Sequence, residues 1–136
     1  MDPSSAAEPD VRKDSRHVLA VPPLNTRVLD DIRGLQAPGR DNVLARIIAL
    51  YLDEAPRLLD ALRVAVERED GAALTRTAHA LKSISGHLGA ERVSLLCRQL
   101  ETVGRGDSVA DAETLFRALQ AEYATAAAAL EELATP

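Results

Sequence analysis

Residues 71–90 read GAALTRTAHALKSISGHLGA, and the spacing of the small and apolar residues in this stretch decides the fold. Five of them recur at steps of three or four residues: Leu74, Ala78, Leu81, Ser85 and Leu88. This is the period of an α-helix that buries one face. Asp70 is suited to be the N-cap, and Gly89 favours a helix end. We therefore predict a helix near 71–88.

The same helical period recurs on both sides of this stretch. Three further long helices are predicted near 42–68, 90–103 and 108–133, and a short one near 26–34. The loops between them have only a few residues, and no segment shows the alternation of a β-strand. The sequence therefore predicts an all-α fold, an antiparallel up-down four-helix bundle capped by the short N-terminal helix.

Residues that favour helix ends set the predicted boundaries. Three helices have a candidate N-cap at their start: Asn25 or Thr26, Asp41, and Asp107 or Ser108. The Gly104-Arg105-Gly106 turn is expected to end the helix near 90–103. Because Pro56 lacks a backbone donor, the helix near 42–68 is expected to kink there.

The composition supports a single helical domain. A chain of 136 residues provides enough material for one core and little for a second. It is 46% hydrophobic but only 2% aromatic, so Leu, Val, Ile and Ala must build that core. The first 23 residues contain four prolines and no sustained apolar period. We predict a flexible leader at 1–23, with Val18–Leu24 lying against the domain, and a bundle domain at 24–136.

Charge and cysteine content exclude several classes of function. The net charge of −5 comes with dispersed lysines and arginines, so there is no basic stripe for nucleic acid. Cys97 is the single cysteine and lies on an apolar stripe, where core packing is the simpler interpretation. No signal-peptide pattern and no apolar run long enough to cross a membrane are present. These features indicate a soluble protein of a reducing cytoplasm.

The outer side of the helix near 71–88 carries residues that folding does not explain. At about 100° per residue, four of them fall away from the buried face: His79, Lys82, Ser83 and Gly86. An exposed histidine gains nothing from packing, and a glycine inside a helix costs about 0.5–1 kcal/mol relative to alanine. We therefore expect these four residues to serve the function of the protein rather than its folding.

These four residues suit chemistry with a phosphoryl group. An exposed imidazole is mostly neutral at pH 7, which leaves one ring nitrogen of His79 free as a nucleophile. Lys82 lies one helical turn away, where its ammonium can reach a dianionic phosphoryl group, and Ser83 can add a hydroxyl donor. Gly86 gives another protein clearance beside the ring. The plainer interpretations are a solvated charge for Lys82 and surface shape for Ser83 and Gly86.

Three segments around His79 form a recognisable pattern. Ala78–Ala90 reads AHALKSISGHLGA, Leu96-Cys97 and Leu100-Glu101 follow it, and Tyr51–Leu62 reads YLDEAPRLLDAL. They resemble the signature of the histidine phosphotransfer (HPt) domain family of two-component phosphorelays. That signature has an Ala-His-x-Leu-Lys run in mid-helix, then Leu-Gly-Ala and Cys-x-x-Leu-Glu.

The resemblance extends from about Leu24 to the C-terminus, with two departures. Ser83 stands where many members have glycine, which is an accepted variation. His87 stands where a small or amide residue is common, and this bears on the choice of partner.

The resemblance implies a function in signal transduction. His79 accepts a phosphoryl group on its outward ring nitrogen from an aspartyl phosphate on a receiver domain, and the phosphohistidine passes it to another receiver domain. Lys82 steadies the phosphoryl group. The implied partners are response-regulator receiver domains and a hybrid sensor histidine kinase, and the protein is a monomer. Mg²⁺ belongs to the receiver, so no cofactor is expected here, nor any kinase or phosphatase activity of the chain's own.

Two other functions are open from the sequence. The first is a helical adaptor that binds a receiver domain or another regulator without carrying phosphate. The second is a metal-dependent hydrolase that uses His79 and His87. The second is disfavoured because the two residues lie about 80° apart around the helix and about 12 Å along it. The expected location is the cytoplasm, or the cytosolic side of the inner membrane if the chain is part of a hybrid sensor kinase.

Overall fold

The computed structural model describes Val18 and residues 20–35, 42–106 and 108–134. These ranges contain five α-helices and no β-strand: α3 (Thr26–Gly34), α4 (Val43–Glu67), α5 (Gly71–His87), α6 (Glu91–Arg105) and α7 (Ala112–Ala134). The prediction of an all-α fold is confirmed. Among the described residues, no helix is both long and apolar enough to cross a membrane.

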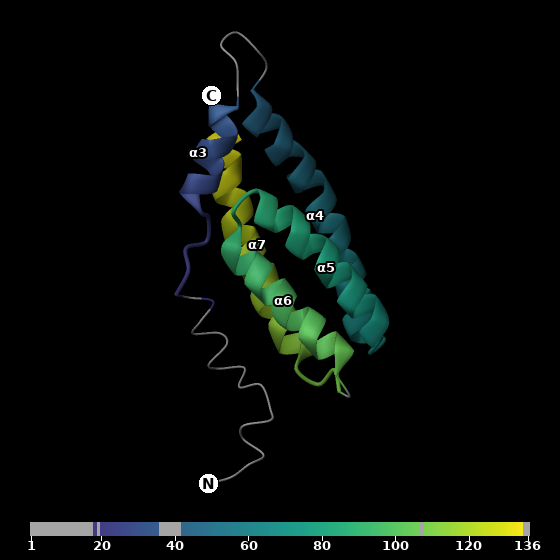
Figure 1. Cartoon of the computed structure of the whole chain (residues 1–136). Coiled ribbons are helices and arrows are strands. Elements are labelled where there is room, and N and C mark those ends of the chain that lie inside the picture. Colours follow the sequence, from purple (N-terminus) through teal and green to yellow (C-terminus); the bar gives the residue numbers. More distant parts are fainter. Residues whose placement is uncertain (1–17, 19, 36–41, 107, 135–136) are drawn as a thin grey trace.

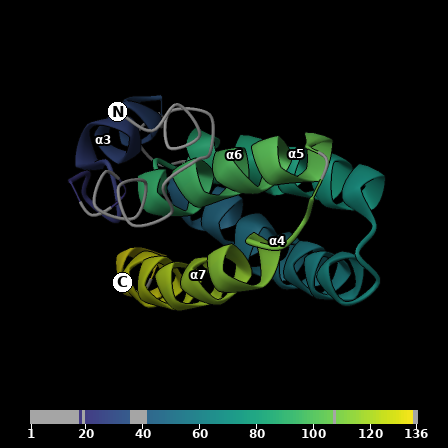
Figure 2. The same ribbon diagram turned by 90° about the horizontal axis from the view of Figure 1, so that it is seen from below.

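The four long helices form a bundle in which each packs on the next. α4 contacts α5, α5 contacts α6, α6 contacts α7, and α7 returns to α4 (Figure 1). The colour gradient of Figure 1 shows that each of these four helices runs opposite to the one before it, as short loops between packed helices require. The short α3 lies at one end of the bundle (Figure 2).

The buried face of α5 is the one that the sequence predicts. The five periodic residues, four in α5 and one at its C-cap, are all at most 1% exposed: Leu74, Ala78, Leu81, Ser85 and Leu88. The hydroxyl of Ser85, the polar residue of this set, lies 2.8 Å from the hydroxyl of Tyr51 on α4. Burial raises the pKa of Tyr51, so this phenol stays protonated and can take part in the hydrogen bond.

The helix starts agree with the predictions in two cases and differ in two. Asn25 and Asp70 cap α3 and α5 as expected, because their side chains accept hydrogen bonds from backbone amides in the first turn. The cap of α4 is Asn42, whose side chain accepts from the amide of Ala45; Asp41 lies outside the described residues.

The prediction that α7 starts near 108 is wrong, because the helix begins at Ala112. The hydroxyl of Ser108 accepts a hydrogen bond from the amide of Ala110 and closes a turn ahead of the helix. Asp107, the other candidate cap, is not among the described residues. α4 continues through Pro56, and the kink at this residue stays a prediction.

α6 ends at Arg105, within the predicted Gly104-Arg105-Gly106 turn and two residues later than 103, so Gly104 itself lies inside the helix. A methyl group at Gly104 would collide with the hydroxyl of Thr75 and would lie 2.8 Å from the carbonyl oxygen of Gly71. The glycine therefore lets α6 approach α5 closely. The sequence alone reads it as a turn signal because a second glycine follows two residues later. Gly89 ends α5 as predicted, with a φ of +72° that favours glycine.

Val18 and residues 20–24, the described residues ahead of the N-cap of α3, pack on the bundle. The side chain of Val18 is 3% exposed, and Leu24 packs against the core. The Arg92 side chain on α6 donates a hydrogen bond to the carbonyl of Val21, and the backbone N–H of Asn25 donates to the carbonyl of Gly89. The expected contact of Val18–Leu24 with the domain is confirmed at Val18, Val21 and Leu24, and Leu19 lies outside the described residues. The division of the chain at residue 23 stays a prediction.

Candidate functional site

The imidazole of His79 lies on the surface of α5 near its middle. Its side chain is 62% exposed, while the residues on the opposite side of the helix, Ala78 and Leu81, are fully buried. The helix is therefore held by its apolar face and presents the ring to solvent. The predicted exposure of His79 is confirmed.

A carboxylate from the next helix lies against this ring. Glu101 on α6 has a side chain only 4% exposed, and its Oε1 atom lies 3.4 Å from Nδ1 of His79. The same oxygen lies 2.7 Å from Nζ of Lys82, and Oε2 lies 3.3 Å from a guanidinium nitrogen of Arg105. One buried acid thus contacts the ring and two cations.

Close packing of α5 on α6 places Glu101 beside His79. The hydroxyl of Thr75, one turn before His79, lies 3.5 Å from the carbonyl oxygen of Glu101 and donates to the carbonyl of Gly71. Gly104, one turn after Glu101, makes this approach possible. The sequence contains one sign of Glu101's role, an acid at the helical spacing of the buried residues Val93 and Cys97 on α6.

Glu101 is ionised at neutral pH. Burial alone would raise its pKa, but the hydrogen bond and charge of Lys82, followed by those of His79, hold the pKa below its ordinary value. The nearby thiol of Cys97 behaves in the opposite way. Burial raises its pKa, and the charge of Glu101 raises it further, so Cys97 is a protonated core residue.

The four residues of the predicted outer face differ in exposure. His79 and Gly86 are exposed, whereas Lys82 and Ser83 are partly buried. The Lys82 side chain is 29% exposed because it turns toward Glu101. The sequence places Lys82 on the solvent side with the other three, and this is corrected: its side chain is partly buried and its ammonium pairs with Glu101.

The packing of the helices does not require a glycine at position 86. A methyl group built on it would meet only the hydroxyl of Ser94, at an ordinary contact distance of 3.8 Å. An alanine would therefore fit and would stabilise the helix. A glycine that the packing does not require agrees with a role in contact with another molecule. Gly104 differs, because the packing of α6 on α5 does require a glycine there.

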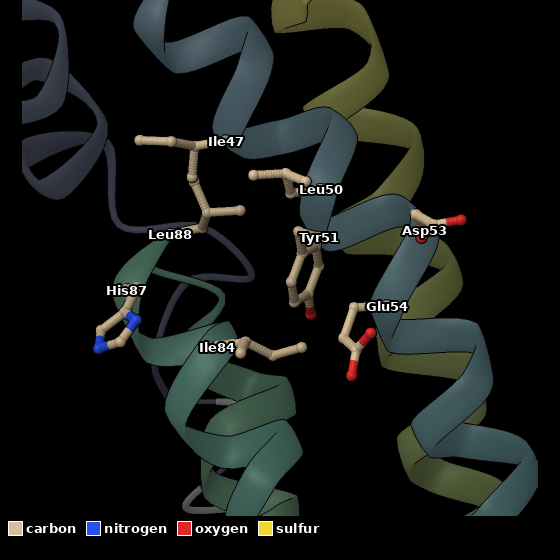
Figure 3. Close-up of a pocket in the computed structure, with 8 residues that line it drawn as sticks. All are labelled: Ile47, Leu50, Tyr51, Asp53, Glu54, Ile84, His87 and Leu88. Atoms are coloured by element: carbon tan, nitrogen blue, oxygen red, sulfur yellow. The ribbon is translucent and has the colours of Figure 1, made fainter.

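An apolar groove lies on the other side of α5, toward α4. It has a volume of about 340 Å³ and is lined by residues of both helices and of the turn after α5: Ile47, Leu50, Tyr51, Asp53, Glu54, Ile84, His87 and Leu88. Figure 3 shows Leu50 and Ile84 facing the same space, with the carboxylate of Glu54 at its edge. Leu50 is 70% exposed and extends the apolar lining of this groove to the surface. Contiguous apolar surface of this kind marks contact sites, whereas a single exposed leucine does not.

The two exposed histidines of α5 do not lie together. His79 contacts Glu101 on the α6 side, and His87 lines the groove on the α4 side. In the described part of the chain, no group of three or more His, Cys, Asp or Glu residues is placed to hold a metal ion.

Comparisons with known proteins agree with this geometry. A family model described as "Hpt domain" matches residues 46–129. Histidine-containing phosphotransfer protein 5 of Arabidopsis thaliana is 29% identical over 70 residues, which cover 49% of this chain and 45% of that protein. The chain thus matches under half the length of that relative.

A solved structure extends the comparison to the fold. The crystal structure of histidine-containing phosphotransfer protein B from Pseudomonas aeruginosa superposes with a TM-score of 0.77 at 24% identity. The match covers 84% of this chain and 96% of that one, and at this identity it shows the fold. Since the family model spans more than half of the sequence and includes His79, Lys82 and Glu101, the chain belongs to the Hpt domain family.

Proposed function

We propose that this chain is a histidine-containing phosphotransfer protein that carries a phosphoryl group on Nε2 of His79 in a phosphorelay. One observation carries the proposal: the ring is exposed at mid-helix, and its Nδ1 atom faces a buried carboxylate. With Nδ1 held toward Glu101 on a side chain that is 62% exposed, Nε2 is the nitrogen that we assign to the outward side. Membership of the Hpt domain family supports this assignment.

The transfer needs only the lone pair of that nitrogen. Nε2 attacks the phosphorus of an aspartyl phosphate on a receiver domain, the bond from phosphorus to the aspartyl oxygen breaks, and its electrons return to the carboxylate. In the next step, the aspartate of another receiver attacks the phosphorus, and the electrons of the N–P bond return to Nε2. The phosphoryl group is moved without hydrolysis.

Lys82 and Ser83 are the proposed partners of the phosphoryl group. The Lys82 ammonium lies 2.7 Å from Glu101, so an incoming phosphoryl group must share this cation with the carboxylate. Ser83 is the next residue on the helix and offers a hydroxyl. Gly86, two turns from His79, is proposed to leave room for the partner's backbone.

The receiver domain is proposed to dock over the outer face of α5 and the groove beside it. Leu50, Ile47 and Ile84 provide apolar surface there. Asp53 and Glu54 at the rim favour basic residues on the partner. Receiver domains of response regulators and of a hybrid sensor histidine kinase are the proposed partners.

The remaining parts of the proposal concern the protein's state. We expect a cytoplasmic monomer with no kinase or phosphatase activity of its own, and Mg²⁺ as a component of the receiver. The net charge of −5 and the single buried cysteine are consistent with this setting.

The test uses two matched variants of one helix. The protein is incubated with a phosphorylated receiver and Mg²⁺, and acid-labile phosphate on the chain is measured. His79→Gln should abolish transfer, whereas His87→Gln should accept phosphate, because both rings are exposed but only one lies beside Glu101. Undiminished labelling of His79→Gln would refute the proposal. Stable binding of the receiver with no phosphohistidine would identify an adaptor.

A further inference from the structure

We propose that Arg76 and Arg98 are specificity-determining residues, whose exposed guanidinium groups attract the acidic phosphorylation site of a receiver domain to His79. This inference rests on the proposed function of His79 and extends it to the chemistry of the partner's surface. It assigns a role to two arginines that the transfer step itself does not need.

Positive charge is concentrated on the α5–α6 side of the bundle. α5 contains one arginine, one lysine and no acid, and α6 contains three arginines and two glutamates, so the pair has a formal charge of +3. The whole chain has a net charge of −5, and α7, with four glutamates and one arginine, has −3. Figure 2 shows α5 and α6 together on one side of the bundle and α7 on the other. The reactive histidine thus lies on the positive side of an acidic protein.

Arg76 lies one helical turn before His79 on α5. Side chains three positions apart on a helix are neighbours, with their Cβ atoms about 5–6 Å apart. Both side chains are exposed. α5 offers Arg76 no acid of its own, and no ion pair joins it to another described residue. Its charge is therefore available to a partner that approaches His79.

Arg98 lies beside the same ring on α6. Two contacts bracket it: the hydroxyl of Ser94 donates to the carbonyl of Lys82 at 3.4 Å, and Oε1 of Glu101 lies 3.4 Å from Nδ1 of His79. Arg98 is four positions after Ser94 and three before Glu101, so it lies at the level of the ring. Its side chain is exposed and forms no ion pair with a described acid.

The two arginines differ from the other cations near the ring. Lys82 and Arg105 contact the carboxylate of Glu101, at 2.7 and 3.3 Å. A cation that already has a carboxylate partner offers less net charge to a second protein. Arg76 and Arg98, which no acid in the described ranges neutralises, keep their full charge at the surface.

The partner that fits this side is acidic at its reacting site. An aspartyl phosphate is an anion, and a Mg²⁺ ion beside a phosphoryl group is held by further carboxylates. A receiver that brings this site over His79 therefore brings negative charge to the two arginines. Asp53 and Glu54 give the rim of the groove the opposite sign on the α4 side. The two sides of the docking face thus favour opposite charges on the partner.

The expected effect is on association rather than on chemistry. Charges at the edge of an interface act mainly on the association rate and its dependence on salt. Their range falls from about 30 Å at 10 mM salt to about 3 Å at 1 M. Transfer takes place at Nε2 of His79, which neither arginine replaces. The signature is therefore slower association at low salt with an unchanged rate of transfer in the complex.

The test measures association and transfer separately. The probe is a receiver domain that phosphorylates the chain, loaded with beryllofluoride and Mg²⁺ as a stable mimic of the aspartyl phosphate. Arg76→Gln combined with Arg98→Gln should lower the association rate constant about three- to tenfold at about 20 mM salt, and less than about twofold at about 500 mM. Arg76→Lys combined with Arg98→Lys keeps both charges and should retain most of the rate. At saturating phosphorylated receiver, all of these proteins should accept phosphate at the same rate.

A matched pair of substitutions removes the same charge elsewhere. Arg63→Gln combined with Arg117→Gln changes arginines of α4 and α7 that are 47% and 75% exposed. Association should then stay within about twofold of the unmodified chain. Equal losses in the two double variants would reduce the effect to net charge and overturn the inference. An association rate constant at low salt that does not respond to Arg76→Gln and Arg98→Gln would overturn it too.

The two proposals fail in different ways. If phosphate never reaches His79, the proposed function is wrong. If His79 is phosphorylated normally while association does not depend on Arg76 and Arg98, only the role of these arginines is wrong.

Discussion

The two flanks of α5 differ although they belong to one helix. Lys82 and Ile84 lie two residues apart, about 80° on either side of the buried direction. Lys82 meets the acid of α6, and Ile84 meets the apolar groove of α4. The two exposed histidines divide in the same way, His79 toward the acid and His87 toward the groove. The packed neighbour thus decides what surrounds a surface residue: one flank presents an imidazole and an ammonium against a carboxylate, and the other presents an apolar groove.

The largest expected effect comes from separating α6 from α5. Gly104→Ala places a methyl group against Gly71 and Thr75, so the free energy of unfolding should fall by about 1–3 kcal/mol. The shift of α6 should also slow phosphotransfer more than it weakens receiver binding, because the groove lies between α4 and α5. Thermal unfolding and binding measurements check this.

The control for Gly104→Ala is Gly34→Ala, at a glycine with nothing within 4 Å of an added methyl group. A Gly104→Ala protein as stable as the unmodified chain would show that the close approach of the helices is not needed.

The second effect concerns the docking flank. Leu50→Asp should weaken receiver binding by about tenfold or more, because it puts a third acid beside Asp53 and Glu54 and removes apolar contact. The rate at which the phosphorylated protein loses its phosphoryl group by hydrolysis in the absence of a receiver should not change. Leu35→Asp alters a leucine that is 79% exposed at the end of α3 and should leave binding intact. Equal losses in both variants would contradict the groove as the docking site.

The third prediction is that one substitution at Gly86 raises the stability of the protein and lowers its rate of phosphotransfer. Gly86→Ala should stabilise the protein by about 0.5–1 kcal/mol, since alanine favours a helix and the added methyl group meets only Ser94 at 3.8 Å. Transfer to a receiver should become several-fold slower if the glycine gives clearance to the partner. A variant that gains stability and keeps its full transfer rate would make Gly86 a surface residue without a role in docking.

The smallest expected effect is the pH dependence of the free energy of unfolding that comes from the titration of Glu101. The pKa of Glu101 is lower in the folded chain than its ordinary value of 4.5, because Lys82 and His79 outweigh the effect of burial. Below that value the unfolded chain binds more protons, so the stabilisation by Glu101 is present above about pH 4.5 and is lost as the pH falls through the folded pKa. The stability difference between the unmodified chain and Glu101→Gln, measured by urea unfolding, should therefore shrink from pH 6 to pH 3. A constant difference would contradict this assignment.

The periodicity of the sequence predicts the features that depend on a single helix, such as which of its faces is buried. The buried face of α5 and the exposure of His79 follow from the spacing of Leu74, Ala78 and Leu81, because a regular helix fixes the angle between successive side chains. Helix ends were less well predicted. Ser108 closes a turn rather than capping α7, since a serine favours both arrangements.

The contacts between helices could not be predicted from the sequence. Glu101 approaches His79 only because α6 packs on α5 in one register, and the glycine that permits this register was interpreted as a turn. The sequence places Lys82 in solvent for the same reason, since its partner lies 19 positions further along the chain on another helix. The groove likewise needs both α4 and α5, so the exposed Leu50 had no evident role in the sequence.

The most direct test of the central claim is an NMR measurement on the ¹⁵N-labelled protein after phosphorylation by a receiver. Coupling between ³¹P and ¹⁵N identifies the nitrogen that bears the phosphoryl group. We expect a single coupling to Nε2 of His79. Coupling to Nδ1 of His79, or to a ring nitrogen of His87, would contradict the account.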